Sequence, residues 1–151
     1  MYDFAMNNKV IGAIGEKIAQ DYLKKLGFVI LETNYRYSKI SEIDIIAHKN
    51  DILHFIEVKT RSGYGFGTPF EAVTKSKLKS VFLCANYYLS NINKKFNKIQ
   101  IDVIGIILSK NSNPEIHFIE DIALWNYISI ASIESKWFLA VCWICLACLN
   151  V

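Results

Sequence analysis

Hydrophobic residues recur along the chain at two spacings, and these spacings predict its secondary structure. Over residues 8–26 they return every three or four positions, the period of a helix, and Gly27 follows as a stop signal. Residues 28–31 and 34–37 look extended, and residues 41–47 and 52–60 alternate on either side of turn residues 48–51. This pattern predicts a β-hairpin and allows a three-stranded meander.

The second half of the sequence predicts one more helix and two more strands. Thr68-Pro69-Phe70-Glu71 has the form of a capping box, so a helix is expected from about Pro69 or Thr74 to Leu89. Its predicted apolar stripe consists of Val73, Leu78, Phe82, Ala85 and Leu89. Residues 99–108 are apolar and β-branched, as in a central strand, and residues 115–119 follow a turn. The element order α-β-β-β-α-β-β indicates the α/β class.

Two glycines interrupt the first predicted helix. Gly12 and Gly15 each cost about 1 kcal/mol relative to alanine inside a helix. A helix that keeps them is expected to have another part of the molecule packed closely against that face.

The length and composition fit one packed domain, expected over residues 8–127. The chain has 151 residues, of which 52% are hydrophobic and 21% charged, so wholesale disorder is not expected. Residues 128–151 are an apolar extension of unassigned role, and its run of thirteen apolar residues, 137–149, is shorter than the ~20 that span a bilayer. Packing of this run on the domain, weak association with a membrane surface or a protein, and no function all remain open.

The charge of the chain is informative mainly in its distribution. A net charge of +3 is too small to argue for nucleic acid, but residues 75–101 contain six lysines and no acid, which makes them a candidate phosphate-facing surface. The four cysteines are not spaced as a disulfide framework, and residues 1–10 carry Asp3 and no long apolar run, unlike a leader. These features predict a cytoplasmic protein.

Acidic residues stand in both strands of the predicted hairpin. Side chains alternate along a strand, so Glu42 and Asp44 are expected on one face, with the isoleucines that follow each of them on the other. The same alternation places Glu57 and Lys59 together on the next strand. If the hairpin brings these faces together, three carboxylates and a lysine share one patch, and the repulsion among the acids favours a divalent cation.

Such a patch is suited to phosphodiester hydrolysis. A cation held by Asp44 and Glu57 could polarise a phosphoryl oxygen and activate water, while Lys59 offsets charge in the transition state. The backbone carbonyl of Val58 is near enough to be a further ligand, although its side chain points into the core. A Glu-x-Lys pattern on an exposed strand is usually a solvated charge pair. These strands are strongly apolar, however, and an acid buried in such a strand costs free energy, so a function is expected for it.

A longer series of residues resembles a known family. The series comprises Gly15-Glu16, Ala19, Tyr22-Leu23, Gly27-Phe28, Ile30-Leu31, Asn34, Arg36, Glu42-Ile43-Asp44-Ile45-Ile46, Phe55-Ile56-Glu57-Val58-Lys59-Thr60-Arg61, Glu71-Ala72-Val73, Lys77 and Asp102-Val103-Ile104. It resembles the bacterial YraN-type family of uncharacterised proteins (UPF0102) over about residues 8–125, most of the chain. Two positions depart from the family pattern: Ser41 stands where glycine is usual, and Gln100-Ile101 stand where arginine is usual.

The YraN-type family in turn resembles the PD-(D/E)XK nucleases, in particular archaeal Holliday junction resolvases. The resemblance implies a restriction-endonuclease-like fold, with a mixed central β-sheet flanked by helices, and cleavage of DNA that depends on Mg²⁺ or Mn²⁺. It makes Asp44 and Glu57 metal ligands, Lys59 the catalytic lysine, Glu16 a further catalytic residue and Glu42 a secondary acid. It also suggests a homodimer, because a symmetric junction presents two sites.

Nucleic-acid contacts outside the acidic patch are expected from Arg61, Lys75, Lys77 and Lys79, although a lysine-rich helix face often serves solubility alone. The glycine-rich loop 61–67 adds two aromatic side chains that could stack on bases. Three functions follow as hypotheses: a metal-dependent nuclease for branched or damaged DNA, a nucleic-acid-binding module of the same fold that does not cut, and a protein-interaction subunit that uses the apolar tail.

Overall fold

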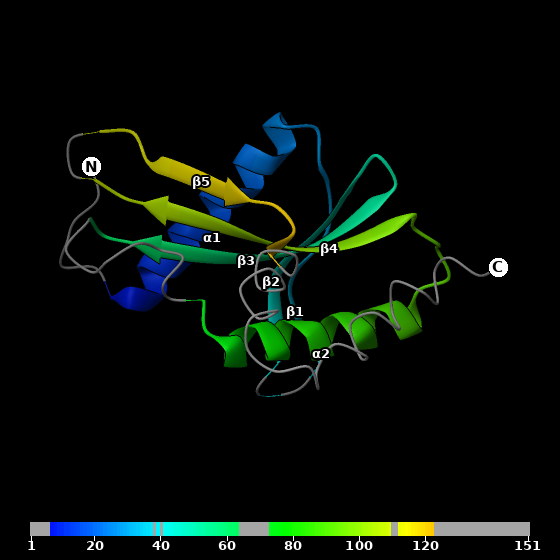
Figure 1. Cartoon of the computed structure of the whole chain (residues 1–151). Helices are drawn as coiled ribbons and strands as arrows, with labels where there is room; N and C mark the ends of the chain where they lie inside the picture. Colours follow the sequence, from blue (N-terminus) through cyan, green and yellow to red (C-terminus); the bar gives the residue numbers. More distant parts are fainter. Residues whose placement is uncertain (1–6, 38, 40, 64–72, 110–111, 123–151) are drawn as a thin grey trace, which may run out of the picture.

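The expected order of helices and strands is confirmed by a computed structural model, which describes residues 7–37, 39, 41–63, 73–109 and 112–122 (Figure 1). The elements are α1 (Asn8–Lys25), β1 (Val29–Arg36), β2 (Glu42–Lys49), β3 (Ile52–Arg61), α2 (Lys75–Asn91), β4 (Lys98–Ile107) and β5 (Glu115–Ile119). The expected capping box, the two aromatic residues of the glycine-rich loop and the apolar tail lie outside the described residues. No helix within the described ranges is long and apolar enough to cross a membrane.

The five strands form one mixed sheet in the order β1-β2-β3-β4-β5. β1, β2 and β3 are an antiparallel meander, β3 and β4 are parallel, and β5 returns antiparallel to β4. The hairpin between β2 and β3 turns on Asn50 (φ 50°) and Asp51 (φ 59°), the positive angles of a type I′ turn. Because two residues suffice for the turn, β2 extends to Lys49, further toward the turn than the sequence indicated, while β3 begins at Ile52 as expected.

One helix covers each face of the sheet (Figure 1). The core beneath α1 includes Leu23, Ile45 and Ile56, and the core against α2 includes Phe55 and Val81. The parallel pair β3 and β4 is crossed over by α2, as parallel neighbours require. The expected α/β fold of restriction-endonuclease-like type is therefore confirmed. It places β2 and β3, the strands that carry the predicted acidic residues, inside the sheet and between the two helices.

Close packing explains one of the two glycines in α1. A Cβ atom added at Gly15 would lie 1.7 Å from Thr60 Oγ1 and 2.8 Å from Thr60 Cβ, so α1 approaches β3 this closely only because Gly15 has no side chain. The expectation was wrong for Gly12, where an added Cβ would meet nothing within 4 Å. Gly27 ends the helix as predicted, with a φ of 85°.

The buried face of α2 differs from the predicted one. The helix begins after Thr74, whose side chain accepts a hydrogen bond from Lys77 N at 3.2 Å, which confirms the later of the two expected starts. Its buried residues are Val81, Cys84, Ala85 and Tyr88, rather than the predicted stripe, of which only Ala85 is buried. The helix carries apolar residues on more than one side, so hydrophobicity alone does not determine which side meets the sheet.

Candidate functional site

β2 and β3 separate at the end of the hairpin remote from its turn. Their register runs from the Lys49–Ile52 pair to the Ile45–Ile56 pair. Beyond the last pair, Asp44 Oδ2 accepts a hydrogen bond from Val58 N at 2.7 Å. The Asp44 side chain thus takes the place of the backbone carbonyl that would accept this bond in a regular β-ladder. The amide and the carbonyl of a strand residue point to the same side, which also directs the Val58 carbonyl toward Asp44.

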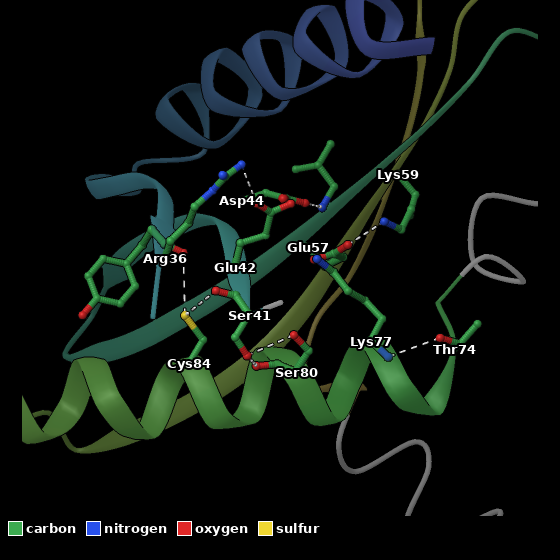
Figure 2. A network of polar contacts seen from close by, with 12 residues as sticks. Arg36, Ser41, Glu42, Asp44, Glu57, Lys59, Thr74, Lys77, Ser80 and Cys84 are labelled. Atoms are coloured by element: carbon green, nitrogen blue, oxygen red, sulfur yellow. Dashed lines mark hydrogen bonds and ion pairs between the residues drawn. The ribbon is translucent and has the colours of Figure 1, made fainter. Parts of the chain in front are cut away.

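Glu57 lies beside this point with a lysine on each carboxylate oxygen (Figure 2). Lys59 Nζ donates to Oε1 at 2.5 Å, and Lys77 Nζ, from the first turn of α2, is 3.1 Å from Oε2. The Glu57 side chain is 1% exposed, whereas those of Lys59 and Lys77 are 28% and 24% exposed. The predicted alternation on β3 is confirmed, and the acid is buried while both lysines retain access to solvent.

The electrostatics of the site act most strongly on Asp44. Burial and the neighbouring Glu57 carboxylate raise the pKa of Asp44 from 3.8 to about 7, against the opposing effects of the Val58 N–H, Lys77 and Lys59. Burial lowers the pKa of Lys77, but Glu57 and Asp44 outweigh it and leave that pKa raised. Lys77 is therefore held as a cation, and the two acids repel each other in a poorly solvated place.

The expected alternation on β2 fails at Asp44. Ile43 packs in the core against α2, whereas Ile45, two residues on, packs in the core beneath α1. The partner strand contains the cause: Asn34, between the register partners of Ile43 and Ile45, has a φ of 52°, which is left-handed. Both strands turn over here, so the prediction that Ile43 and Ile45 share a face was wrong.

Glu42 borders the site and is held by another partner. Its Oε2 is 2.8 Å from Arg36 Nη2, and its side chain is 40% exposed. It is also among the acids that raise the pKa of Lys77. Glu42 thus contributes negative potential near Lys77, while its carboxylate is engaged at the strand edge.

Glu16 reaches the same region from α1, through Asn34. Its Oε2 accepts a hydrogen bond from Asn34 Nδ2 at 3.1 Å, and Asn34 is the β1 residue that faces Asp44 across the strand pair. The left-handed backbone of Asn34 therefore has two consequences, the reversal of the strand faces and a link between α1 and the site. Neither was visible from the pattern of hydrophobic residues.

Ser41 and α2 are joined next to the acidic residues. Ser41 Oγ donates to the Ser80 carbonyl at 3.0 Å, and Cys84 Sγ contacts the carbonyls of Tyr35 at 3.6 Å and Ser41 at 3.8 Å (Figure 2). Ser80 is one helical turn beyond Lys77, so these bonds help hold α2 where Lys77 meets Glu57. The serine that departs from the family pattern thus has a positioning contact.

Another buried acid, Asp102, has structural partners. Its Oδ2 is 2.6 Å from His54 Nδ1, and its Oδ1 accepts a hydrogen bond from Asp121 N at 2.8 Å. The His54 and Asp102 side chains are 2% and 0% exposed. This pair ties β3, β4 and the segment after β5 together, and it is enclosed rather than accessible to a ligand.

Among the described residues, two acids, Asp44 and Glu57, combine in the buried part of the site. No group of three or more His, Cys, Asp or Glu side chains is arranged to hold a metal within the part of the chain that the structure describes. The available donors are oxygens: Asp44, Glu57 and the Val58 carbonyl. Glu57 Oε2 is buried and makes no hydrogen bond of acceptable geometry, although Lys77 Nζ is nearby. This donor set suits Mg²⁺, which keeps several waters and uses one or two protein carboxylates.

The other predicted cationic residues lie around the site rather than in it. Arg61 ends β3, and its Nε is buried without a hydrogen-bond partner. Lys75 and Lys79 are exposed on the first turns of α2. Lys77 alone of the three helix lysines reaches Glu57, so its role in the site was missed when it was grouped with phosphate-binding residues. Its spacing from Val81, Cys84 and Tyr88 follows the buried stripe and could have revealed it.

Comparison with known proteins identifies the family of the chain. A model of the uncharacterised protein family UPF0102 matches residues 15–106. A UPF0102 protein of Dictyoglomus thermophilum is 50% identical over 106 residues, 70% of this chain and 89% of the relative. Others, from Clostridium botulinum strain Loch Maree and Rhodococcus opacus, are 45% identical over 117 residues and 39% over 115, each covering 76% of this chain and 94% and 97% of the relative. The chain therefore belongs to the UPF0102 family, the YraN type that its sequence resembled.

Proposed function

We propose that this protein is a nuclease that uses a divalent cation to hydrolyse phosphodiester bonds in branched or damaged DNA. The observation that carries the proposal is the pair of buried, mutually repelling carboxylates, Asp44 and Glu57, with Lys59 and Lys77 against Glu57. Two buried carboxylates this close to each other reduce stability, so a protein that keeps them is expected to need them for binding or catalysis. A strongly raised pKa in combination with charged neighbours is also typical of functional sites.

A cation would be held by Asp44, Glu57 and the Val58 carbonyl. When bound, Mg²⁺ or Mn²⁺ supplies Lewis acidity toward a phosphoryl oxygen and an activated water. The protein's part is to orient the ligands, and the 2.7 Å bond from Val58 N fixes the Asp44 carboxylate for this purpose. Lys59 and Lys77 provide positive charge beside the position where negative charge develops on the phosphoryl group.

DNA is the substrate class that fits the surroundings of the site. Lys75 and Lys79 are exposed near Lys77, so phosphates approaching the site would meet a run of lysines on α2. Arg61, at the end of β3, would add a further contact. The homodimer suggested by the resemblance to junction resolvases is part of the same proposal, since two sites would be needed to cut two strands.

A non-catalytic nucleic-acid-binding module is the alternative, and one observation favours it. Both oxygens of Glu57 are occupied by lysines at 2.5 Å and 3.1 Å, which leaves a cation to compete with Lys77. In such a module the lysines would bind phosphates and the acids would only position the lysines. The third hypothesis, a protein-interaction subunit, depends on the apolar tail, which lies outside the described residues.

Cleavage assays with matched variants distinguish these functions. Purified protein is offered linear, flapped and four-way DNA with Mg²⁺ or Mn²⁺, beside Asp44→Asn, Glu57→Gln and Lys59→Ala, with Glu120→Gln as control because Glu120 is an exposed acid outside the site. A nuclease loses cleavage in the first three variants but retains DNA binding, and the control remains active. Binding without cleavage by the wild type supports the module, and absence of both contradicts the two nucleic-acid functions.

A further inference from the structure

Two exposed tyrosines stack on each other beside α2. The ring centroids of Tyr37 and Tyr87 are 4.3 Å apart, their planes are 32° from parallel, and the residues are 50% and 42% exposed. Leu83, one turn before Tyr87 on the same side of the helix, is 49% exposed and extends the apolar surface. A contiguous group of exposed apolar residues is a candidate binding surface, whereas single exposed apolar residues are normal on a protein surface.

A neighbouring tyrosine pair shows how a purely structural contact looks in this fold. Tyr35 and Tyr88 meet edge to face, with centroids 5.1 Å apart and planes at 86°, and Tyr88 is 9% exposed. Tyr88 also meets Phe55 edge to face in the core. Core packing accounts for this pair, but it does not account for two tyrosines whose rings stack in the open.

The exposed tyrosine pair lies beside α2, further toward the end of the helix than the acidic site. Lys77 contacts Glu57, and Tyr87 follows ten residues later, about 15 Å along the axis at the rise of an α-helix. This length corresponds to about four steps of stacked nucleotides at ~3.4 Å each. On the strand side, Tyr37 N donates to the Ser41 carbonyl at 3.1 Å, just before β2, the strand that contains Asp44. Tyr87 thus lies on the helix that carries Lys77, and Tyr37 lies between β1 and β2, the strand that carries Asp44.

We propose that Tyr37 and Tyr87 form a stacking platform for an unpaired base about four nucleotides from the phosphate at Asp44 and Glu57. The inference rests on the proposed nuclease function and narrows its substrate to DNA in which a single-stranded segment adjoins the cleaved bond. Bases inside a duplex are covered on both faces, whereas an unpaired base exposes them to an aromatic ring. Arg36, next to Tyr37, is 68% exposed in its side chain but is paired with Glu42 at 2.8 Å, so positive charge for the backbone of that strand would come from Lys75 and Lys79 on α2.

Binding measurements without a cation test the platform independently of cleavage. Fluorescence anisotropy compares a blunt duplex with the same duplex carrying a single-stranded tail, both in chelator. Tyr37→Ala and Tyr87→Ala are expected to weaken binding of the tailed DNA by roughly 5- to 150-fold and to leave the blunt duplex unchanged. Tyr87→Phe keeps the ring and should retain affinity. Val10→Ala is the control, since Val10 is 45% exposed, comparable to the tyrosines, but lies on α1 over the other face of the sheet.

An abasic scan of the tail makes the test independent of any variant's folding. One abasic position should weaken binding by the wild type as much as Tyr87→Ala does, and the two changes together should cost no more than either alone. The proposal is overturned if the abasic scan is flat, if the blunt and tailed DNAs lose affinity equally, or if the alanine variants only dissociate a dimer. If the wild type binds the blunt and the tailed duplex equally well, the platform proposal is overturned but the nuclease proposal still stands. If the wild type binds no DNA at all, both proposals are contradicted.

Discussion

Replacing Asp44 with asparagine is predicted to stabilise the protein above neutral pH. The variant keeps an oxygen for the Val58 N–H, which is 2.7 Å from Asp44 Oδ2, and it removes a charge from a buried place. A pKa raised from 3.8 to about 7 corresponds to roughly 4 kcal/mol that the ionised carboxylate costs the folded state. The new amide nitrogen costs about 1 kcal/mol if it lacks a partner, which leaves a gain of about 3 kcal/mol.

The sign of the effect depends on pH. Between the unfolded and folded pKa values the folded protein holds a proton that the unfolded chain has lost, so stability of the wild type falls as pH rises from about 4 to about 7. Asp44→Asn removes this slope. The variant should therefore match the wild type or be slightly less stable near pH 4, and should exceed it by the full amount near pH 8.

Urea unfolding in chelator at both pH values measures the difference, with Glu120→Gln as an exposed control. Millimolar Mg²⁺ should narrow the gap at high pH, because it stabilises the form with an ionised Asp44. The reasoning is refuted if Asp44→Asn is as destabilising at pH 8 as at pH 4. That result would mean that Lys59 and Lys77 stabilise the carboxylate by more than burial and Glu57 destabilise it.

Two further substitutions test the packing and the charge of the site. Gly15→Ala should destabilise the protein by about 1–3 kcal/mol, because its Cβ would lie 1.7 Å from Thr60 Oγ1, while Gly12→Ala, with open space around it, should stabilise by about 0.5–1 kcal/mol. Equal effects of the two in urea unfolding would contradict the close approach. Lys77→Met removes the cation 3.1 Å from Glu57 Oε2, so Mn²⁺ should bind on the order of tenfold more tightly while cleavage slows. Weaker Mn²⁺ binding by this variant would mean that Lys77 supports the site only structurally.

The sequence was sufficient to predict the secondary structure and the strand faces where the local pattern agrees with the pairing in the folded sheet. β3 pairs with β4 over its whole length, so the alternation that places Glu57 and Lys59 on one face is undisturbed. The helix at residues 8–25 has a cap at Asn7 and a stop at Gly27, and both signals are local. The pairing of Glu57 with Lys59 could therefore be predicted without knowledge of the sheet.

The rest of the site depends on how strands end, which is not a periodic property. Asp44 reaches Val58 N because β2 has left the ladder there, and the strand faces reverse opposite the left-handed Asn34. Asparagine tolerates a left-handed backbone, but the residues on either side of Asn34 give no sign that the backbone is left-handed there. The link from Asn34 to Glu16 is likewise formed only when α1 packs on the sheet.

The other error was the prediction of which side of α2 faces the sheet. Because of it, Lys77 was not recognised as the second lysine of the site. The helix has apolar residues on several sides, and the sheet selects the stripe of Val81, Cys84 and Tyr88, whose smaller members allow close approach. Lys77 continues that stripe at the same spacing and is thereby directed to Glu57. Hydrophobicity favoured Leu78 and Phe82 instead, because it ignores the space available at the partner surface.

Manganese binding at pH 8, followed by electron paramagnetic resonance, tests most directly whether Asp44 and Glu57 form a cation site. The account predicts one site per chain in the wild type and in Glu120→Gln, and loss of that site in both Asp44→Asn and Glu57→Gln, with each variant still folded. Retention of the bound ion in either variant, or absence of binding in the wild type in the presence of DNA, would contradict it.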